Sequence, residues 1–285
     1  MYAAFIEDLE SHYKQIEWRE FACGWGAAFI NITLTYPIYK MIFRQMLDGI
    51  SMKSALLQLH NEGIYFLYRG MAPPLAQKTL SLSVMFGMYE NIRRPLNACN
   101  VNDYTAKFIA AMLSGTAEVT FMPFERVQTL LSCSAYHLQF RNMYHAFRVV
   151  GTYGFTEYYR GIVPILWRNG PSNACFFIAR DEVNKLIPPE NSVLLHTVHG
   201  FVSGAVIGAV TSSIFYPLNV VKISMQSTLG GRTPNMFVAF KQIYVERGGK
   251  IRYIYTGIEA NLIRAFLGWG VMNAAYGYMR RIFFE

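Results

Sequence analysis

The stretch Glu62-Gly63-Ile64-Tyr65-Phe66-Leu67-Tyr68-Arg69-Gly70 decides the fold of this chain, because its last three residues return once unchanged and once with one residue replaced. Aromatic, variable residue and glycine recur at Tyr159-Arg160-Gly161 and Tyr255-Thr256-Gly257, in steps of 91 (68 to 159) and 96 (159 to 255). Upstream of each tripeptide an apolar run contains a proline after Tyr or Met. These prolines are Pro37, Pro123 and Pro217, in steps of 86 and 94. Because both series advance together, a unit of roughly ninety to one hundred residues repeats three times.

The composition is that of a membrane protein. Hydrophobic residues make up 53% of the 285 residues and charged residues only 15%, against about 25% charged in an average soluble domain. Several apolar stretches approach or exceed the roughly 20 residues that a helix needs to cross a bilayer. They cover residues 21–43, 71–93, 105–131, 162–185, 196–223 and 258–280. The sequence therefore predicts an all-α membrane protein with six transmembrane helices, two in each repeat.

Charge and cysteine usage indicate which partners to expect. The net charge of +8 suits anionic lipid headgroups, although the basic residues of the connectors also fit a simple solvated flank. The four cysteines have no metal-like spacing and lie mostly in or beside apolar runs, where a thiol is usually a small hydrophobe. We therefore expect no disulfide, no metal, no cofactor, no nucleic-acid partner and no obligate protein partner.

Targeting and catalytic motifs are not visible in the sequence. The first residues carry Glu7, Asp8 and Glu10 rather than a basic or Arg-rich leader, so we expect no cleavable presequence. We find no glycine-rich dinucleotide fingerprint after a strand, no metal cluster and no nucleophile elbow. The sequence therefore predicts a protein that is not an enzyme.

Each repeat follows the same internal plan. Small residues at one-turn spacing in the first span, clearest at Gly200, Gly204 and Gly208, allow close helix packing in lipid. The proline kinks this span near its end, and a polar connector with short helical patterns follows. A glycine ends the connector, and the backbone amides that start the next span can hold an anionic lipid headgroup, for example cardiolipin. The three glycines concerned are Gly70, Gly161 and Gly257.

Together these features resemble the mitochondrial carrier family. Its repeat reads proline, any residue, acid, two residues, base, and later acid, glycine, four residues, aromatic, base, glycine. The second part is complete at Glu62 to Gly70, whereas repeat two has Tyr153 in the acidic place and repeat three keeps only Tyr255 and Gly257. The resemblance covers residues 1–285 as one domain, with repeats 15–100, 101–190 and 191–285.

This resemblance implies an arrangement and a location. It implies three pseudo-symmetric repeats of tilted helices around a central cavity, with short helices on the matrix side. It also implies a multi-pass protein of the mitochondrial inner membrane whose cavity opens alternately to the two sides.

The first family signature is eroded at the positions that would close the matrix side. In the family, the acid of each proline signature pairs with the base of the next repeat. The acid and base positions here are Tyr39 and Ile42, Glu125 and Gln128, and Asn219 and Lys222. Because only Glu125 and Lys222 can pair, we expect a weak matrix gate that Tyr39 and neighbouring hydrogen bonds support. An alternative is that the chain has lost transport and acts as a scaffold or receptor.

A second family signature, which marks the gate on the cytoplasmic side, is also incomplete. It consists of an aromatic residue, an acid, two further residues and a base near the end of each even-numbered span. The three copies here are Tyr89, Glu90 and Arg93; Arg180, Asp181 and Asn184; and Tyr276, Gly277 and Arg280. We expect Tyr89, Glu90, Arg93, Asp181 and Arg280 to form what remains of this gate.

Three cations are expected at one depth of the cavity. The seventh and eighth residues after the glycine that opens each even-numbered span match the family's substrate contacts. They are Gln77 and Lys78, Arg168 and Asn169, and Arg264 and Ala265. Ionisable groups in membrane helices are costly and usually mark a pathway or a site. The sequence therefore predicts a triangle of Lys78, Arg168 and Arg264 that Gln77 and Asn169 assist.

One carboxylate is expected at the same depth. Glu118 precedes Glu125 by seven residues, so the two share a helix face about two turns apart if the helix is continuous. The alternative is that Glu118 merely pairs with a cation and holds helices together. Trp167 would stack on a substrate ring if it faced inward, but an aromatic residue here more often faces lipid.

The charge pattern predicts a polyanion with a local positive charge, and oxidised NAD fits it. Segments 121–131 and 158–166 also resemble the NAD carriers of the family. That resemblance implies import of NAD into the matrix, with Lys78, Glu118, Arg168 and Arg264 at matching positions. An adenine nucleotide or coenzyme A carrier remains an alternative, as does the non-transporting scaffold.

Overall fold

Three pairs of long helices make up the body of the molecule. The computed structural model describes residues 18–99, 101–186 and 193–284, and every regular element in these ranges is helical. The first pair is α2 (Trp18–Asp48) and α5 (Ala72–Ala98). The second is α6 (Asp103–Ala117), continued by η1 (Glu118–Phe121) and α7 (Met122–Ser132), with α9 (Ile162–Leu186). The third is α10 (Val193–Ile214), continued by α11 (Tyr216–Gln226), with α14 (Ile258–Phe284).

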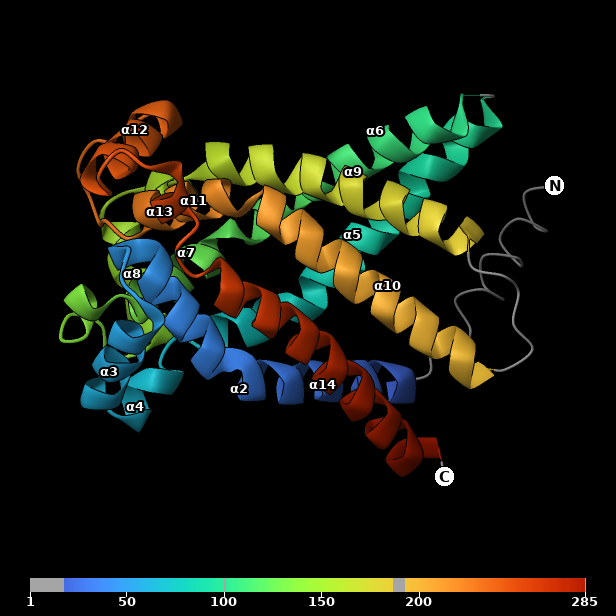
Figure 1. Ribbon diagram of the computed structural model, residues 1–285, viewed down its shortest axis with the longest axis horizontal. Helices are drawn as coiled ribbons and strands as arrows, with labels where there is room; N and C mark the ends of the chain where they lie inside the picture. The colour runs from blue at the N-terminus through green and yellow to red at the C-terminus, as the bar shows by residue number, and fades with distance from the viewer. Residues whose placement is uncertain (1–17, 100, 187–192, 285) are drawn as a thin grey trace.

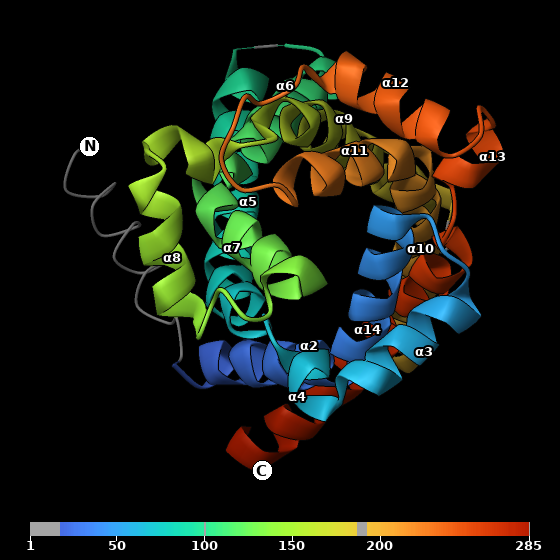
Figure 2. The same ribbon diagram turned by 90° about the vertical axis from the view of Figure 1, so that its left-hand side faces the viewer.

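The long helices form a closed ring. Helix α2 packs against α5, α5 against α6 and α7, and α9 against both α6 and the α10/α11 segment. Helix α14 then packs against α10 and returns to α2, so the last helix closes the ring onto the first. The end-on view in Figure 2 shows this ring around the axis of the bundle. The ring agrees with the predicted all-α fold of three helix pairs around a centre.

Short helices gather at one end of the ring (Figure 1). They are α3 (Met52–Glu62), α4 (Ile64–Tyr68), η2 (Ser134–Tyr136), α8 (Met143–Thr152), η3 (Phe155–Tyr159), α12 (Met236–Glu246) and α13 (Ile251–Ile254). Ser51, Asn142 and Asn235 cap the N-termini of α3, α8 and α12 by accepting a backbone N–H of the first turn. This end is the predicted connector side, and we call it the short-helix end.

The three prolines act differently along the first helix of each pair. Pro37 lies within a continuous α2, whereas Pro123 and Pro217 stand in the first turn of α7 and α11, just after a break. A first-turn proline costs no helical hydrogen bond, because its missing N–H would have had no partner there. At two of the three predicted kinks the helix is therefore broken, before Pro123 and before Pro217, whereas α2 continues through Pro37.

The glycines that open the even-numbered helices are required by close contacts as well as by dihedral angles. Gly70, Gly161 and Gly257 have φ values of 87°, 84° and 94°. A Cβ atom at Gly70 would lie 2.9 Å from the Tyr36 hydroxyl, and one at Gly257 would lie 2.7 Å from the Tyr216 hydroxyl. Both hydroxyls donate to the carbonyl just before the glycine, at 3.0 Å and 2.7 Å. The Tyr-Pro motif therefore fixes where the next long helix begins.

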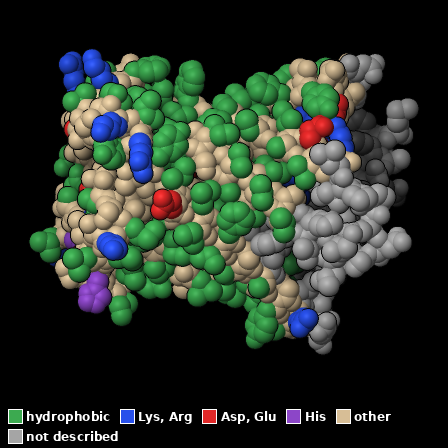
Figure 3. Space-filling view, viewed as in Figure 1, with side chains coloured by type: hydrophobic (Ala, Val, Ile, Leu, Met, Phe, Trp, Pro, Cys, Tyr) green, Lys and Arg blue, Asp and Glu red, His purple; other side chains and the backbone are tan. Residues whose placement is uncertain are grey.

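Apolar side chains cover the outside of the ring between its two ends. Figure 3 shows hydrophobic side chains spread over this face, with Lys and Arg more frequent toward the short-helix end. On α10, Val202, Val206, Val210 and Ile214 recur at one-turn spacing and are about half exposed. By length and hydropathy, no single helix in the described ranges qualifies as a membrane span, whereas Val202–Ile214 with Tyr216–Gln226, bent by 61°, qualifies as a pair.

Candidate functional site

A polar cavity of about 390 Å³ lies inside the ring. Both members of each helix pair contribute to its wall. The described polar lining residues are Asn31, Thr35, Tyr36, Tyr39, Gln77, Glu125, Gln128, Thr129, Arg168, Asn219, Lys222, Asn261 and Arg264. Among them Glu125 is the one carboxylate, against Arg168, Lys222 and Arg264. The described wall is therefore cationic and rich in carboxamides, a combination suited to phosphate oxygens and to hydroxyl or amide groups.

Arg168, on α9, reaches the cavity and is held by two asparagines. Its Nε and Nη2 donate to Asn169 Oδ1 at 2.8 Å and 2.5 Å, and its Nη1 donates to Asn219 Oδ1 at 2.6 Å. The guanidinium orientation is fixed in this way without a carboxylate partner among the described residues. Arg168 thus keeps its charge available to an anion in the cavity.

Arg264, on α14 of the third helix pair, lines the same cavity. Within the described ranges no hydrogen bond or ion pair to its side chain is found, and its Nε is buried without a partner. A buried guanidinium nitrogen without a hydrogen-bond acceptor is costly. Binding an oxyanion would remove that cost, so Arg264 is suited to bind a substrate anion.

Glu125 and Lys222 form the ion pair that the sequence predicts. Lys222 Nζ lies 3.3 Å from Glu125 Oε2, and Gln77 Nε2 lies 3.5 Å from Glu125 Oε1. Tyr39 lines the cavity beside them, and its ring packs against Tyr36 and Phe43 with centroids 5.4 Å and 6.3 Å apart. The pair joins the second and third helix pairs near the short-helix end, while its role as a gate stays a prediction.

Glu118 and Asn169 lie differently from the sequence prediction. Neither Glu118 nor Asn169 is among the described residues that line the cavity. Asn169 is 4% exposed, and its Nδ2 donates to Glu118 Oε2 at 2.9 Å across the contact between the second pair's helices. The reason is that residues 118–121 form a 3₁₀ turn with three residues per turn, so the α-helical face argument fails there. Glu118 therefore acts on Arg168 indirectly, by holding Asn169.

The side chain of Lys78 lies outside the described residues, so the predicted triangle is described at two of its corners, Arg168 and Arg264. Trp167 is 60% exposed and does not line the cavity, so it faces outward.

At the opposite end of the ring, two of the predicted cytoplasmic-side gate residues pair with α6. Arg93 Nη2 lies 3.2 Å from Asp103 Oδ1, and Lys107 Nζ lies 2.6 Å from Asp181 Oδ2. Tyr89 stacks on Phe177 with ring centroids 4.0 Å apart. The side chains of Glu90 and Arg280 lie outside the described residues. Among the described residues, then, Arg93 and Asp181 each pair with a residue of α6 and not with each other.

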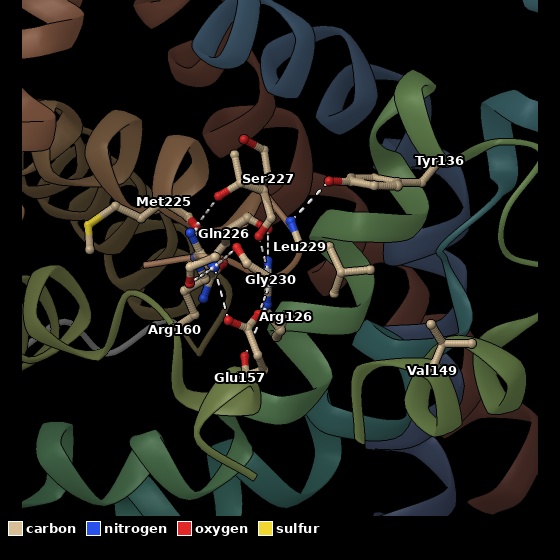
Figure 4. Close-up of polar contacts among 12 residues, drawn as sticks. Arg126, Tyr136, Val149, Glu157, Arg160, Met225, Gln226, Ser227, Leu229 and Gly230 are labelled. Carbon is tan, nitrogen blue, oxygen red and sulfur yellow. Dashed lines mark hydrogen bonds and ion pairs between the residues drawn. The ribbon is translucent and has the colours of Figure 1, made fainter. Parts of the chain in front are cut away.

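A buried ion cluster holds the second helix pair to the third beside the cavity (Figure 4). Glu157 pairs with Arg126 at 2.8 Å and with Arg160 at 2.9 Å. The two arginines also donate to backbone oxygens at the end of α11 and just after it. These are the carbonyl oxygens of Met225, Gln226, Thr228 and Gly230. All three residues of the cluster are at most 7% exposed.

Sequence reasoning missed several residues of the site. Asn219 had been noted only as a departure from the acidic signature, yet it contacts Arg168 directly. Asn261 precedes Arg264 by three residues, which places both on one helix face, and that spacing was a usable signal. Asn31 and the outer residues Asp103 and Lys107 match no motif, so the sequence contained no signal that could have identified them.

Comparison with known proteins decides the family. The model of the mitochondrial carrier protein family matches residues 15–98, 100–191 and 194–285, one helix pair in each segment. The chain belongs to the mitochondrial carrier family. The mitochondrial nicotinamide adenine dinucleotide transporter SLC25A51 of Mus musculus is 41% identical over 279 residues, which is 97% of this chain and 94% of the relative. The Homo sapiens protein of that name is 40% identical over 278 residues, 97% of this chain and 94% of the relative.

A further member of the family is more distant. Solute carrier family 25 member 53 of Homo sapiens is 32% identical over 268 residues, which covers 92% of this carrier and 87% of that protein. Family membership makes this chain a carrier protein, and the short-helix end corresponds to the matrix side that the family's repeat signature implies.

Proposed function

We propose that this carrier imports oxidised NAD across the mitochondrial inner membrane into the matrix. The observation that carries the proposal is that Arg168 and Arg264, one held by neutral groups and the other without a described partner, line one cavity together. The names of the similar mouse and human transporters favour the dinucleotide over other phosphate compounds. We propose no enzymatic activity and no bound cofactor, since NAD is the transported substrate.

The binding mode follows from the charges of the wall. Arg168 and Arg264 bind the pyrophosphate, because guanidinium forks form charge-assisted hydrogen bonds to phosphate oxygens. Lys78 is proposed as the third cation. The carboxamides of Gln77, Asn31 and Asn261 bind ribose hydroxyls or base edges. Glu118 contributes by fixing Asn169, which orients Arg168.

Transport proceeds by alternating access. With Glu125 and Lys222 paired, the matrix end of the cavity is closed by one ion pair, supported by Gln77 and the Tyr39 ring. Substrate binding favours the other state only if the substrate binds that state more tightly. We propose Tyr89, Glu90, Arg93, Asp181 and Arg280 as the cytoplasmic-side gate that closes in the second state.

Anionic lipid is the proposed second ligand. The amides after Gly70, Gly161 and Gly257 begin the even-numbered helices and suit a phosphate group. At Gly257 a separate cavity of about 310 Å³ includes Arg252 and Thr256 in its wall, which supports a headgroup such as cardiolipin there. Stabilisation of the purified carrier by added cardiolipin, weakened in Arg252→Gln, tests this.

Uptake of labelled NAD by proteoliposomes tests the main proposal. Wild-type protein should import NAD, whereas Arg168→Ala and Arg264→Ala should reduce uptake at least tenfold while their melting temperatures stay near that of wild type. Trp167→Ala is the matched control, because Trp167 neighbours Arg168 on α9 and faces outward. Wild-type uptake by either arginine variant would remove that residue from the site.

A competition panel identifies the substrate. Unlabelled NAD should compete better than its reduced form, its mononucleotide or ATP. Stronger competition by ATP or coenzyme A would replace the proposal with a carrier for those compounds. A folded, reconstituted protein that imports none of them would support the scaffold.

A further inference from the structure

Asn219 links a substrate-level cation to the matrix end. It belongs to α11, while Arg168 belongs to α9, and the bond of 2.6 Å between them joins these two helices inside the cavity wall. Asn219 lies three residues before Lys222, so both project from the same face of α11. Breaking the Arg168–Asn219 hydrogen bond therefore alters α11 one turn away from the Glu125–Lys222 ion pair.

Asn219 is a neutral acceptor for a permanently charged donor. The Arg168 guanidinium has five N–H donors, and both of its described acceptors are amide oxygens. A phosphate group is negatively charged and can accept two parallel bonds from one guanidinium, whereas an amide oxygen is a neutral acceptor, so the ion–ion contact is the stronger of the two. A substrate phosphate can therefore displace Asn219 from Arg168. A carboxylate at position 219 would instead compete with the phosphate on equal terms.

We propose that Asn219 is a positioning residue that holds Arg168 ready in the empty carrier and releases it to the substrate anion. Release breaks the link between α9 and α11 beside the matrix ion pair, and so couples substrate binding to opening of the matrix end. The coupling rests on the proposed function, because it takes the anion to be NAD. It explains why an amide in the place of the family's acid serves this carrier: the amide orients Arg168 without neutralising it.

The Asn219→Asp variant tests the charge of this acceptor. The new carboxylate keeps the shape of the side chain and pairs with Arg168, so the melting temperature of the empty, detergent-purified carrier should rise. The KM for NAD uptake in proteoliposomes should rise by roughly tenfold, the factor that corresponds to about 1.4 kcal/mol of lost affinity. Because NAD binds the variant more weakly, added NAD should raise the melting temperature of the purified variant less than that of the wild type.

The Asn219→Ala variant distinguishes loss of the hydrogen bond that holds Arg168 from neutralisation of the Arg168 charge. It removes the link but leaves the charge of Arg168 free, so the melting temperature of the empty carrier should fall. Its KM should rise less than that of Asn219→Asp, and stabilisation by NAD should persist. A merely structural role for Asn219 would lower the melting temperature in both variants without this divergence in KM.

An Arg168→Gln background supplies the control, because there Asn219→Asp should no longer raise the melting temperature. The inference is wrong if Asn219→Asp keeps the wild-type KM, or if Asp and Ala change KM and melting temperature alike. Failure of wild-type protein to import NAD would instead contradict the proposed function. The melting temperatures of the empty variants would still decide whether Asn219 holds Arg168.

Discussion

The contact between the second and third helix pairs and the contact between the third and first occupy equivalent places and are built differently. In the former, Glu157 forms ion pairs with two buried arginines, which also donate to backbone oxygens at the end of α11 and just after it. In the latter, Thr256 stands where the signature base belongs, and Arg247 donates instead to the carbonyl oxygens of Met46 and Tyr253. One contact is an internal ion cluster, whereas the other is a single arginine on backbone oxygens.

This difference indicates which contact between helix pairs holds more strongly at the matrix end. Equivalent glycines still pack on the next helix pair in both places, Gly161 on Gln226 and Gly257 on Gln45, so the backbone geometry is shared. What differs is the charge. We therefore expect the contact between the third and first pairs to loosen first when the matrix end opens.

The largest effect is expected from Glu157→Gln. The substitution leaves Arg126 and Arg160 buried without a counter-charge and should cost about 3 to 5 kcal/mol of stability. The melting temperature of the purified carrier measures it. Glu259→Gln, an exposed glutamate in the first turn of α14, is the control and should change the melting temperature little. Equal losses in the two variants would mean that the buried cluster contributes no more to stability than an exposed glutamate does.

A smaller loss is expected from Arg247→Gln. The side chain gives up hydrogen bonds to Met46, Tyr253 and Ile254 oxygens, and the expected cost is about 1 to 3 kcal/mol because no buried charge is left behind. Denaturation of both variants under one set of conditions ranks them. A loss as large as that of Glu157→Gln would show that the two contacts are equally strong.

Restoring the signature base should change stability still less. Thr256 borders the cavity of about 310 Å³ together with Ser51 and Gln45, so an arginine has room there. Thr256→Arg should be neutral or stabilise by up to about 1 kcal/mol. It should also recover part of the stability that Arg247→Gln loses. A marked loss of melting temperature would mean that this contact does not accept a second cation.

A further effect is a pH dependence at the contact between the first and second pairs. Burial, with Lys40, Arg69 and Arg44 nearby, lowers the pKa of His137 from 6.5 to about 4. Its ring stacks on Phe66 with centroids 4.3 Å apart. Because the unfolded chain takes up the proton first, stability contributed by neutral His137 is complete above pH 6.5 and is lost as pH falls toward 4.

His137→Phe should therefore reduce the fall in melting temperature between pH 6.5 and pH 4. The variant keeps the stacking but has no titrating group. An unchanged pH profile would mean that other groups cause the dependence.

The sequence was sufficient where one local rule decided the outcome. Three glycine tripeptides and three prolines predicted the three helix pairs. The resemblance to the family implied the Glu125–Lys222 pair and cavity positions for Arg168 and Arg264, and the structure has that pair and both arginines in the cavity wall. Glu118 was placed wrongly, because the helix changes its period at residues 118–121 and one sequence does not display that change.

By itself the sequence determined three repeats of apolar helices, since repeat spacing and hydropathy are properties of the chain alone. Only the tertiary structure decided which polar groups meet. Asn219 and Arg168 are 51 residues apart, and Arg247 lies 201 residues from Met46. Such contacts depend on ring closure between α14 and α2 and on the angles of packed helices, which no local pattern encodes.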